Sequence, residues 1–408
     1  MKIVILGAGQ AALQTALSLR QGHFDGDIDI VGNEPFLPYQ RPPLSKAYLK
    51  GALERERLFL KPQEFFDEQN ITLHLAQQVS AIDKEAKRIS GDNGFALDYD
   101  RLVLATGSRP RHLDLPGRDL ENIFDLRGMA DVDAMADKFQ AGKRLVIIGG
   151  GYIGLEAASV ARAMGLEVTV LEAAPRLLAR VAEPEISEFY TQLHKSHGVE
   201  IITQCQIKGF QGSQQVTAIE FADGSTLPAD LVITGIGILP NVELAEAAGI
   251  AVDNGIVVDE LGRTSVANIY ATGDCTLHPN KFLGRDLRLE SVPHAIDQSK
   301  AVASDILGAP QAYAEVPWFW SDQYDVKLQI SGVPTQIDKK VLRGDGDSTS
   351  FAWFYFTGDK LTGVTTVNRA AEFMAGKQLI LRALRDGASI DPEALRDETQ
   401  KPKSWLAD

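Results

Sequence analysis

The chain has 408 residues, 44% hydrophobic and 24% charged, which is long enough for two or three domains with cores of their own. Its formal net charge of −14 argues against a nucleic-acid-binding protein, because phosphates would be repelled. Its two cysteines, Cys205 and Cys275, lie far apart, which argues against a disulfide framework, a structural zinc site and a dithiol redox pair.

The N-terminal part of the chain is predicted to fold as a β-α-β unit. A strand over residues 2–6 is followed by Gly7-Ala8-Gly9, a helix over 11–20 and a strand over 27–31. A glycine-rich turn between strand and helix is typical of a dinucleotide-binding unit, because its backbone can approach a pyrophosphate at the helix N-terminus. The third glycine position is Ala12, which that position allows. Because the chain enters a strand at Lys2 and has no uncharged apolar run of about 20 residues, we expect no signal peptide, no membrane span and a cytoplasmic location.

A second unit of the same kind begins 142 residues later. A strand over 144–148 precedes Gly149-Gly150-Gly151-Tyr152-Ile153-Gly154, and the next strand ends in Glu172. A carboxylate there accepts hydrogen bonds from a ribose 2′-hydroxyl and repels a 2′-phosphate, so the unit is predicted to prefer NADH over NADPH. The nearby Arg176 and Arg180 argue the other way, because an arginine can bind a phosphate. In the first unit the ribose contact could be Asn33, Glu34 or both.

Two such units in one chain indicate two dinucleotides bound face to face, so that electrons can pass between them. The rest of the chain is predicted to contain a proline-rich loop, a linker, further short strands and a β-rich aromatic C-terminal domain. The loop covers 35–43, the linker lies near Pro110 and Pro116, and the strands cover 101–107, 230–235, 255–259, 268–274, 318–320, 326–330 and 351–356. The last stretch, with Pro402, is predicted to be a loose tail.

Together these motifs resemble the FAD-containing, NADH-dependent ferredoxin reductases that serve bacterial haem monooxygenases and ring-hydroxylating dioxygenases. The resemblance covers almost the whole chain. It rests on Gly7-Ala8-Gly9, Arg41-Pro42-Pro43-Leu44-Ser45-Lys46, Ala105-Thr106-Gly107, Gly149-Gly150-Gly151-Tyr152-Ile153-Gly154-Leu155-Glu156, Gly235-Ile236-Gly237, Ala271-Thr272-Gly273-Asp274-Cys275, Glu290-Ser291-Val292-Pro293 and Pro317-Trp318-Phe319-Trp320-Ser321-Asp322-Gln323-Tyr324. It implies an α/β fold of the glutathione-reductase type, with two Rossmann-like dinucleotide-binding domains and a C-terminal α+β domain. The implied FAD domain covers 1–110 and 243–312, the NADH domain 111–242 and the C-terminal domain 313–408.

The resemblance also implies where the cofactors FAD and NADH would bind. Lys46 would lie beside the flavin ring, Asp274 would bind the ribityl chain, and Val292 would offer a backbone N–H to the pyrimidine side of the ring. Asn33, where the family usually has Asp, would contact the adenosine ribose. Ala11 would contact the pyrophosphate, Val79 the adenine, and Arg127 the cofactor from the linker region. The further residues assigned to cofactor binding are Gly7, Gly9, Ala12, Glu34, Arg41, Ala105, Thr106, Gly107, Gly149, Gly151, Tyr152, Ile153, Gly154, Glu172, Gly235, Ile236, Gly237, Gly273, Ser291 and Trp320.

Four residues are predicted to act at the reacting centre. Lys46 and Glu156 would form an ion pair near the face where hydride is transferred, and Tyr152 would cover the flavin until nicotinamide displaces it. Trp320 would lie near the flavin, while Trp318, on the same face of its strand, is left undecided. The plainer alternatives are solvated charges for the ion pair and simple packing for the aromatic residues. No metal site is expected.

The implied activity is that of a flavoprotein oxidoreductase that passes electrons from NADH through FAD, one at a time, to an acidic [2Fe–2S] ferredoxin that feeds an oxygenase. Candidate docking cations are Lys300, Lys327, Lys339, Lys340 and Arg343. Residues 35–50 contain no cysteine, which argues against related flavoenzymes that work through a redox cysteine in this loop. The remaining alternatives are a rubredoxin or monodehydroascorbate reductase of the same fold, and a non-catalytic flavoprotein like the apoptosis-inducing factors.

Overall fold

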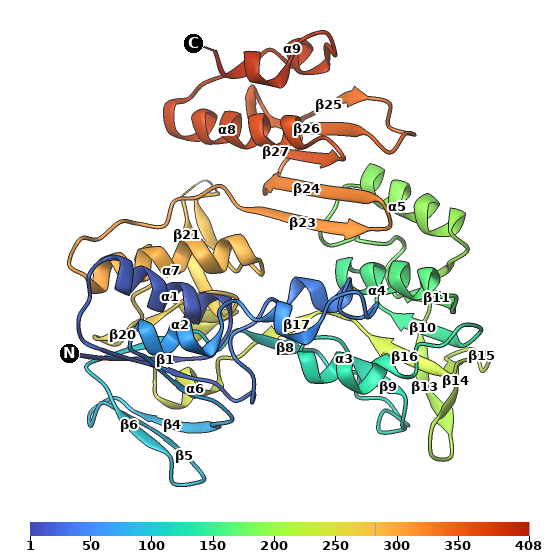
Figure 1. The fold of residues 1–408 in the computed structure, drawn as a ribbon. Coiled ribbons are helices and arrows are strands. Elements are labelled where there is room, and N and C mark those ends of the chain that lie inside the picture. The colour runs from blue at the N-terminus through green and yellow to red at the C-terminus, as the bar shows by residue number, and fades with distance from the viewer. Residues whose placement is uncertain (282, 408) are drawn as a thin grey trace.

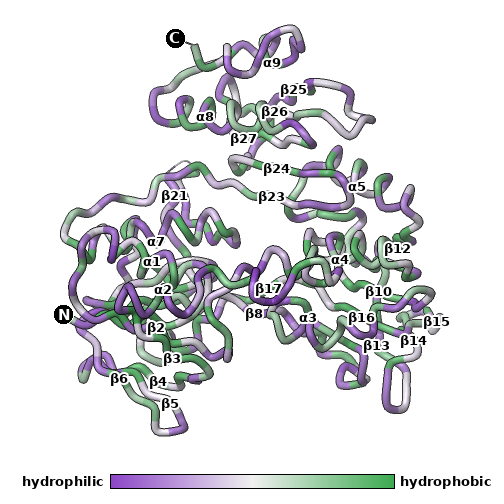
Figure 2. Tube along the Cα trace, in the orientation of Figure 1, coloured by the Kyte–Doolittle hydropathy of each residue, from purple (hydrophilic) through white to green (hydrophobic). Residues whose placement is uncertain are grey.

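The computed structural model of the protein describes residues 1–281 and 283–407, which form three lobes. Figure 1 shows two lobes side by side at the bottom and a third above them, with the N-terminus in the first lobe and the C-terminus at the top. The chain passes twice between the lower lobes, at β8 (Ser108–Pro110) and β17 (Ile238–Pro240), which pair antiparallel. Figure 2 shows hydrophobic residues gathered in strands inside the lobes.

The first lobe is built on a parallel sheet of order β20-β7-β1-β2-β3. Side chains of β1 alternate between two cores: Ile3 and Ile5 pack with helices α1 and α7, whereas Val4 and Leu6 share a core with residues of two small sheets, the antiparallel β4-β5-β6 and the mixed β18-β19-β21-β22. Because β20 comes from late in the chain, the second lobe is inserted in sequence between two parts of the first. The elements of the first lobe are β1 (Lys2–Leu6), α1 (Gln10–Gln21), β2 (Asp27–Val31), the 3₁₀ turns η1 (Pro42–Ser45) and η2 (Arg55–Leu58), α2 (Gln63–Glu68), β3 (Ile71–His74), β4 (Val79–Asp83), β5 (Arg88–Gly91), β6 (Ala96–Asp98), β7 (Arg101–Leu104), α6 (Glu243–Ala247), β18 (Val252–Asp253), β19 (Gly255–Val257), β20 (Ile269–Ala271), β21 (Thr276–Asn280), β22 (Arg285–Leu287) and α7 (Val292–Ile306).

The second lobe repeats this plan with a parallel sheet of order β12-β11-β10-β16-β9. Leu145 and Ile147 of β10 belong to the core that holds helices α3, α4 and α5, and Val146 and Ile148 belong to the core under a small antiparallel sheet. The elements of the second lobe are β9 (Ile123–Asp125), α3 (Met129–Ala136), β10 (Arg144–Ile148), α4 (Tyr152–Ala163), β11 (Glu167–Glu172), α5 (Pro184–Ser196), β12 (Glu200–Thr203), β13 (Ile207–Gly212), β14 (Val216–Phe221), β15 (Thr226–Pro228) and β16 (Leu231–Thr234). The two predicted β-α-β units are therefore confirmed.

The C-terminal lobe is an antiparallel sheet of order β23-β24-β27-β26-β25 with helix α8 on one face. The other face packs on the second lobe, where Leu328 and Phe351 share a core with Tyr190 of α5. The lobe therefore rests on the second lobe through buried apolar surface. Its elements are β23 (Trp318–Gln323), β24 (Val326–Gly332), β25 (Lys339–Gly344), β26 (Phe351–Thr357), β27 (Lys360–Val367), α8 (Ala370–Asp386), α9 (Pro392–Arg396) and the 3₁₀ turn η3 (Pro402–Leu406).

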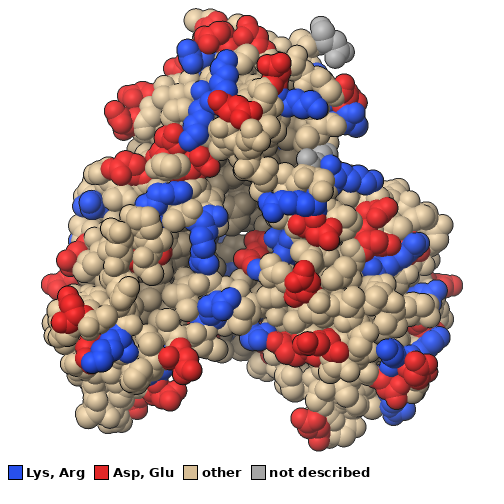
Figure 3. Space-filling view, turned by 180° about the vertical axis from the view of Figure 1, so that it is seen from behind, with Lys and Arg blue, Asp and Glu red and all other residues tan. Residues whose placement is uncertain are grey.

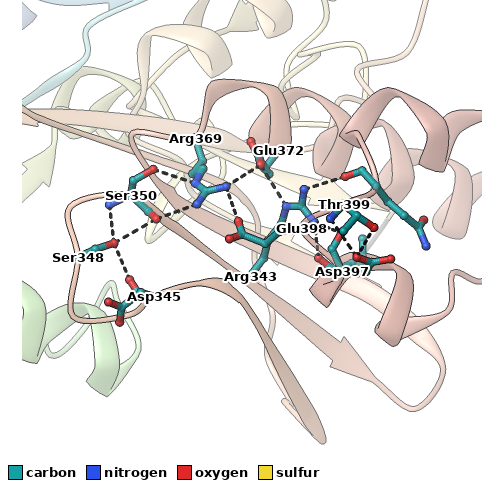
Figure 4. A network of polar contacts seen from close by, with 11 residues as sticks. Arg343, Asp345, Ser348, Ser350, Arg369, Glu372, Asp397, Glu398 and Thr399 are labelled. Atoms are coloured by element: carbon teal, nitrogen blue, oxygen red, sulfur yellow. Dashed lines mark hydrogen bonds and ion pairs between the residues drawn. The ribbon is translucent and has the colours of Figure 1, made fainter.

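The prediction of a loose C-terminal tail is wrong. Trp405 in η3 is only 8% exposed, and its ring contacts the ring of Phe354 edge-on at 5.7 Å. Arg343 of β25 explains the order, because its guanidinium binds Glu372 and donates to the backbone carbonyls of residues 395, 397 and 400 at 2.6–3.2 Å (Figure 4). The side chain of Arg343 is 3% exposed, so its assignment as a docking cation is also wrong.

Candidate active site

A cavity of about 580 Å³ lies where the three lobes meet. The first lobe contributes the segments that follow β1, β2, β7 and β20. These are carboxyl ends of parallel strands, where open α/β sheets place their ligands. The beginning of α4 enters the cavity from the second lobe, β23 from the C-terminal lobe, and the N-terminus of α7 from the first lobe again.

The first glycine turn has the shape that a dinucleotide requires. Gly7 has φ +120°, and a Cβ placed there would lie 2.1 Å from the carbonyl oxygen of Ala105, so only glycine fits. Gly9 is different: it caps α1, lines the cavity, and a Cβ there would meet no protein atom within 4 Å. The open side of Gly9 beside the first N–H groups of α1 fits a pyrophosphate, so the residues present suit FAD in this lobe.

The second glycine turn repeats this geometry. Gly149 has φ +112°, with a would-be Cβ 2.3 Å from the carbonyl oxygen of Gly235, and Gly151 is open like Gly9. At Gly154 a Cβ would lie 2.5 Å from the carbonyl oxygen of Gly149, so helix and turn pack too closely for a larger residue. This turn fits a second dinucleotide.

Glu172 ends β11 next to the second turn, as expected. Its Oε2 accepts a hydrogen bond from the N–H of Gly150 at 2.8 Å, and its Oε1 accepts one from Ala174 N–H at 2.8 Å. These contacts hold the carboxylate at the edge of the turn. Arg176 donates to the carbonyl of Ala182 and also binds Ser187, so its guanidinium already has partners; Arg180 Nη2 lies 3.4 Å from the carbonyl oxygen of Ile236.

The two ribose candidates of the first lobe, Asn33 and Glu34, lie at the end of β2. Both oxygens of Glu34 are engaged, Oε1 by Arg41 at 2.6 Å and Oε2 by the hydroxyl of Tyr39 at 2.6 Å. Burial is the main cause that raises the pKa of the Tyr39 phenol, so it stays a neutral donor. Asn33 and Glu34 both line the cavity, and both stay predicted candidates for the ribose contact.

A second cluster of polar side chains lies in the wall of the cavity. Arg127 Nη2 contacts Asp274 Oδ2 at 3.0 Å, and both side chains bind the hydroxyl of Ser108, which donates to Asp274 at 2.9 Å. The N-terminus of α7 opens nearby, with Ser291 as its cap: Ser291 Oγ accepts the His294 N–H at 3.2 Å. The helix begins at Val292, and its positive end suits a group that gains negative charge.

The predicted ion pair between Lys46 and Glu156 is present. Lys46 Nζ lies 2.6 Å from Glu156 Oε2, and Glu156 is only 4% exposed, so the alternative of a solvated helix charge is wrong for it. Ser45 donates to the same oxygen at 2.5 Å, and Ser321 of the C-terminal lobe donates to Oε1 at 2.6 Å. The carboxylate thus joins all three lobes at the wall of the cavity.

The aromatic residues at the cavity divide into two groups. Tyr152 contacts the ring of Phe319 at 4.7 Å, and both line the cavity together with Trp320. Trp318 shares a face with Trp320, at 5.5 Å, but packs against Phe373 of α8 outside the cavity lining. Burial raises the pKa of the Tyr152 phenol, which therefore stays neutral.

The structure brings most of the residues predicted for FAD, and those predicted to react, to the cavity wall. These are Gly7, Gly9, Ala11, Asn33, Glu34, Arg41, Lys46, Ala105, Thr106, Gly107, Arg127, Tyr152, Ile153, Glu156, Gly273, Asp274, Ser291, Val292 and Trp320. Ala12 and Val79 are buried elsewhere in the first lobe, Ala12 in α1 and Val79 in β4. Gly149, Gly151, Gly154, Glu172, Gly235, Ile236 and Gly237 gather around the second turn, outside the lining of this cavity.

Sequence reasoning missed several lining residues, among them Phe36, Tyr39, Ser45, Ser108, Asn241, Glu290 and Phe319. Ser45, Glu290 and Phe319 stand inside motifs on which the family resemblance rests, so the sequence did carry a signal that could have identified them. Tyr39 and Ser108 carried no comparable pattern, because their roles depend on partners distant in the chain, at residues 129 and 274.

Two dinucleotide-binding lobes that meet at one cavity, with a lysine paired to a buried glutamate in its wall, define an oxidoreductase that uses two nucleotide cofactors. The family described as Pyridine nucleotide-disulphide oxidoreductase matches residues 1–299, and the family described as Reductase C-terminal matches residues 318–406. The chain belongs to the pyridine nucleotide-disulphide oxidoreductase family, in its group of FAD- and NAD(P)H-dependent ferredoxin reductases. This confirms the resemblance drawn from the sequence.

Individual relatives agree over nearly the full length. The chain is 42% identical over 411 residues to putidaredoxin reductase of Pseudomonas putida, covering 99% of this chain and 96% of that protein. It is 42% identical over 381 residues to rhodocoxin reductase of Rhodococcus erythropolis, covering 93% and 89%. Its fold matches that of the reductase in the covalent putidaredoxin reductase–putidaredoxin complex with a TM-score of 0.95 and 42% identity, covering 100% of this chain and 98% of that one.

Proposed function

We propose that this enzyme takes electrons from NADH and delivers them, one at a time, to an acidic [2Fe–2S] ferredoxin that feeds a bacterial oxygenase. The observation that carries the proposal is that one cavity is lined by the FAD-type glycine turn, the start of α4 and β23. When bound there, FAD would supply the change from a two-electron donor to one-electron delivery. The chain's own residues would bind the cofactor, orient it and shield it.

The first lobe would hold FAD by contacts spread along the cofactor. The turn at Gly9 and the N-terminus of α1 would bind the pyrophosphate, Asp274 the ribityl chain and Asn33 the adenosine ribose. The N-terminus of α7 at Val292 would face the pyrimidine edge of the ring and stabilise negative charge there.

The second lobe would bind the reductant. The turn at Gly151 would receive the pyrophosphate of NADH, and Glu172 would accept hydrogen bonds from its ribose and repel the 2′-phosphate of NADPH. Tyr152, held against Phe319, would cover the ring position until nicotinamide enters. Lys46, held by Glu156, would orient its ammonium at the ring.

The domain division proposed for this activity is 1–110 with 243–312 for FAD, 111–242 for NADH and 313–408 for the C-terminal domain. We also propose a cytoplasmic site of action, because the reductant NADH is a cytoplasmic metabolite. Among the described residues, none of the helices has the length and apolar character needed to cross a bilayer.

The ferredoxin would dock over the cavity mouth through local positive charge. Figure 3 shows a central hollow on the face opposite to Figure 1, with several Lys and Arg side chains at its rim. Among the candidate cations, Lys340 is paired with Glu183 and Glu185 of the second lobe at 2.9 Å each. Lys300 and Lys327 lie within 2.8–2.9 Å of acidic neighbours, and Lys339 is exposed. All four lysines remain proposed docking cations.

Anaerobic titration tests the proposal. The purified yellow protein is expected to be reduced by one equivalent of NADH, and the reduced protein to pass electrons rapidly to a bacterial [2Fe–2S] ferredoxin. A rubredoxin serves as the comparison acceptor, because a rubredoxin reductase of the same fold is the alternative activity. Rapid turnover with rubredoxin and none with ferredoxins would contradict the choice of partner, and slow turnover with every acceptor would favour a non-catalytic flavoprotein.

A further inference from the structure

A buried row of hydrogen bonds runs from Glu156 into the interface between the second and C-terminal lobes. Ser321 Oγ lies 2.6 Å from Glu156 Oε1, and Gln323 Nε2 lies 3.1 Å from Ser321 Oγ. Gln323 Oε1 lies 2.8 Å from His194 Nε2, and the Tyr324 hydroxyl lies 3.3 Å from His194 Nδ1. Ser321, Gln323 and His194 are each fully buried.

The donors in this row all point in one direction. Gln323 uses its amide N–H on Ser321, so its carbonyl oxygen must accept from His194, which then carries its proton on Nε2. Burial lowers the pKa of His194 to about 4, in keeping with a neutral ring whose Nδ1 accepts from Tyr324. Ser321 in turn donates to Glu156. A row of aligned donors ending on a carboxylate strengthens each bond in it.

These hydrogen bonds connect side chains from elements that lie far apart in the sequence. Ser321 and Gln323 point to the same side of β23, His194 comes from α5, and Glu156 from α4. Figure 1 places β23 along the lower edge of the C-terminal lobe, beside α5 and above α4. On the other side of Glu156, Lys46 and Ser45 complete the carboxylate's partners from the first lobe.

We propose that Ser321, Gln323 and His194 are positioning residues, which hold the Glu156 carboxylate in place and through it fix the Lys46 ammonium at the flavin. The proposal rests on the proposed binding of FAD in the shared cavity. With Ser321 removed, the buried Glu156 Oε1 loses its short hydrogen bond, and Ser45 and Lys46 hold the carboxylate through Oε2 alone, so its orientation toward Lys46 is less firmly fixed.

The test measures the two-electron reduction potential of bound FAD by equilibration with a reference dye, which needs neither NADH nor ferredoxin. An ammonium near the ring favours the reduced flavin, which carries more negative charge. Lys46→Met is therefore expected to shift the equilibrium at least tenfold against reduction, which is about 30 mV for a two-electron couple. Ser321→Ala is expected to shift it in the same direction by roughly threefold or more, and Gln323→Met by less, because it acts one bond further away.

The matched control is Asp322→Asn, between the two residues on the same strand. The Asp322 side chain points to the other side of β23 and pairs with Lys327 at 2.9 Å, so its replacement is expected to leave the potential unchanged. Ser321→Cys keeps a weak S–H donor with little change in volume, and an intermediate shift is expected.

Thermal unfolding and flavin content separate the outcomes. Ser321→Ala, Ser321→Cys and Gln323→Met proteins that unfold at lower temperature but keep the wild-type potential would make the row merely structural and overturn the proposal. An Asp322→Asn protein whose potential shifts as much as that of Ser321→Ala would overturn it as well. Wild-type protein that binds no FAD would instead contradict the proposed function and leave no flavin for these residues to position.

Discussion

Replacing Gly9 by valine is expected to produce a folded protein that has lost its FAD. Gly9 has φ −99°, which every residue adopts, and a Cβ placed there would meet no protein atom within 4 Å. The same open side faces the cavity at the N-terminus of α1, where the pyrophosphate is expected. The substitution therefore leaves the fold intact and obstructs the ligand.

The size of the effect follows from two losses. Forcing extra methyl groups into a close contact costs about 1–3 kcal/mol, and moving a phosphate away from backbone N–H donors costs about 1.5–3 kcal/mol. Together these weaken FAD binding by about 60-fold to 20,000-fold. Gel filtration followed by the ratio of flavin to protein absorbance measures retention, and circular dichroism measures folding.

Two further glycine substitutions serve as matched comparisons for Gly9→Val. Gly151→Val changes the equivalent open position of the second turn and is expected to retain FAD while weakening NADH binding. Gly7→Ala places a Cβ 2.1 Å from a carbonyl oxygen at φ +120°, so it is expected to destabilise the fold itself by about 3 kcal/mol or more. A Gly9→Val protein that is folded and carries a full complement of FAD would refute the assignment of the first site.

Three further predictions concern the second turn, the contacts by which Arg343 holds the C-terminal segment, and the buried pair His278 and His294. Glu172→Ala is expected to relax the preference for NADH, and an unchanged ratio of kcat/KM for NADH and NADPH would contradict the ribose contact. Arg343→Met removes the guanidinium that binds Glu372 and three backbone carbonyls, and it should destabilise the C-terminal lobe by about 3–5 kcal/mol. Limited proteolysis should then cleave within 395–406. A variant that resists proteolysis as well as wild type would show that these Arg343 contacts do not hold the C-terminal segment in place. Burial lowers the pKa of His278 to about 4 and that of His294 to about 3, below the value of about 6.5 in an unfolded chain. Because the unfolded state takes up these protons first, their full contribution to stability is present above pH 6.5. It falls as the pH drops toward 4, by about 3 kcal/mol or more, and urea denaturation at pH 7 and pH 5 checks this. Equal urea midpoints at pH 7 and pH 5, in the wild-type protein as in the His278→Asn variant, would show that the pair contributes nothing to the pH dependence of stability.

The two β-α-β units and their glycine turns could be predicted from the sequence alone. The strands at residues 2–6, 27–31 and 144–148 were predicted with the boundaries that the structure has. The physical reason is local: a run of apolar residues forms a buried parallel strand, and a glycine is needed where the turn has positive φ and touches the next strand. The Lys46–Glu156 pair was also predicted, because both residues stand in motifs that the family resemblance identified.

Features that depend on partners distant in the chain emerged only from the folded molecule. Sequence alone placed Arg343 on a docking surface and left the tail loose, because nothing near either shows that each buries the other. It likewise offered no sign that Ser321 binds a carboxylate 165 positions earlier, or that Glu34 is occupied by Tyr39 and Arg41. Local patterns fix the backbone of each unit, whereas the hydrogen-bond partners of a side chain exist only once the three lobes have closed around one cavity.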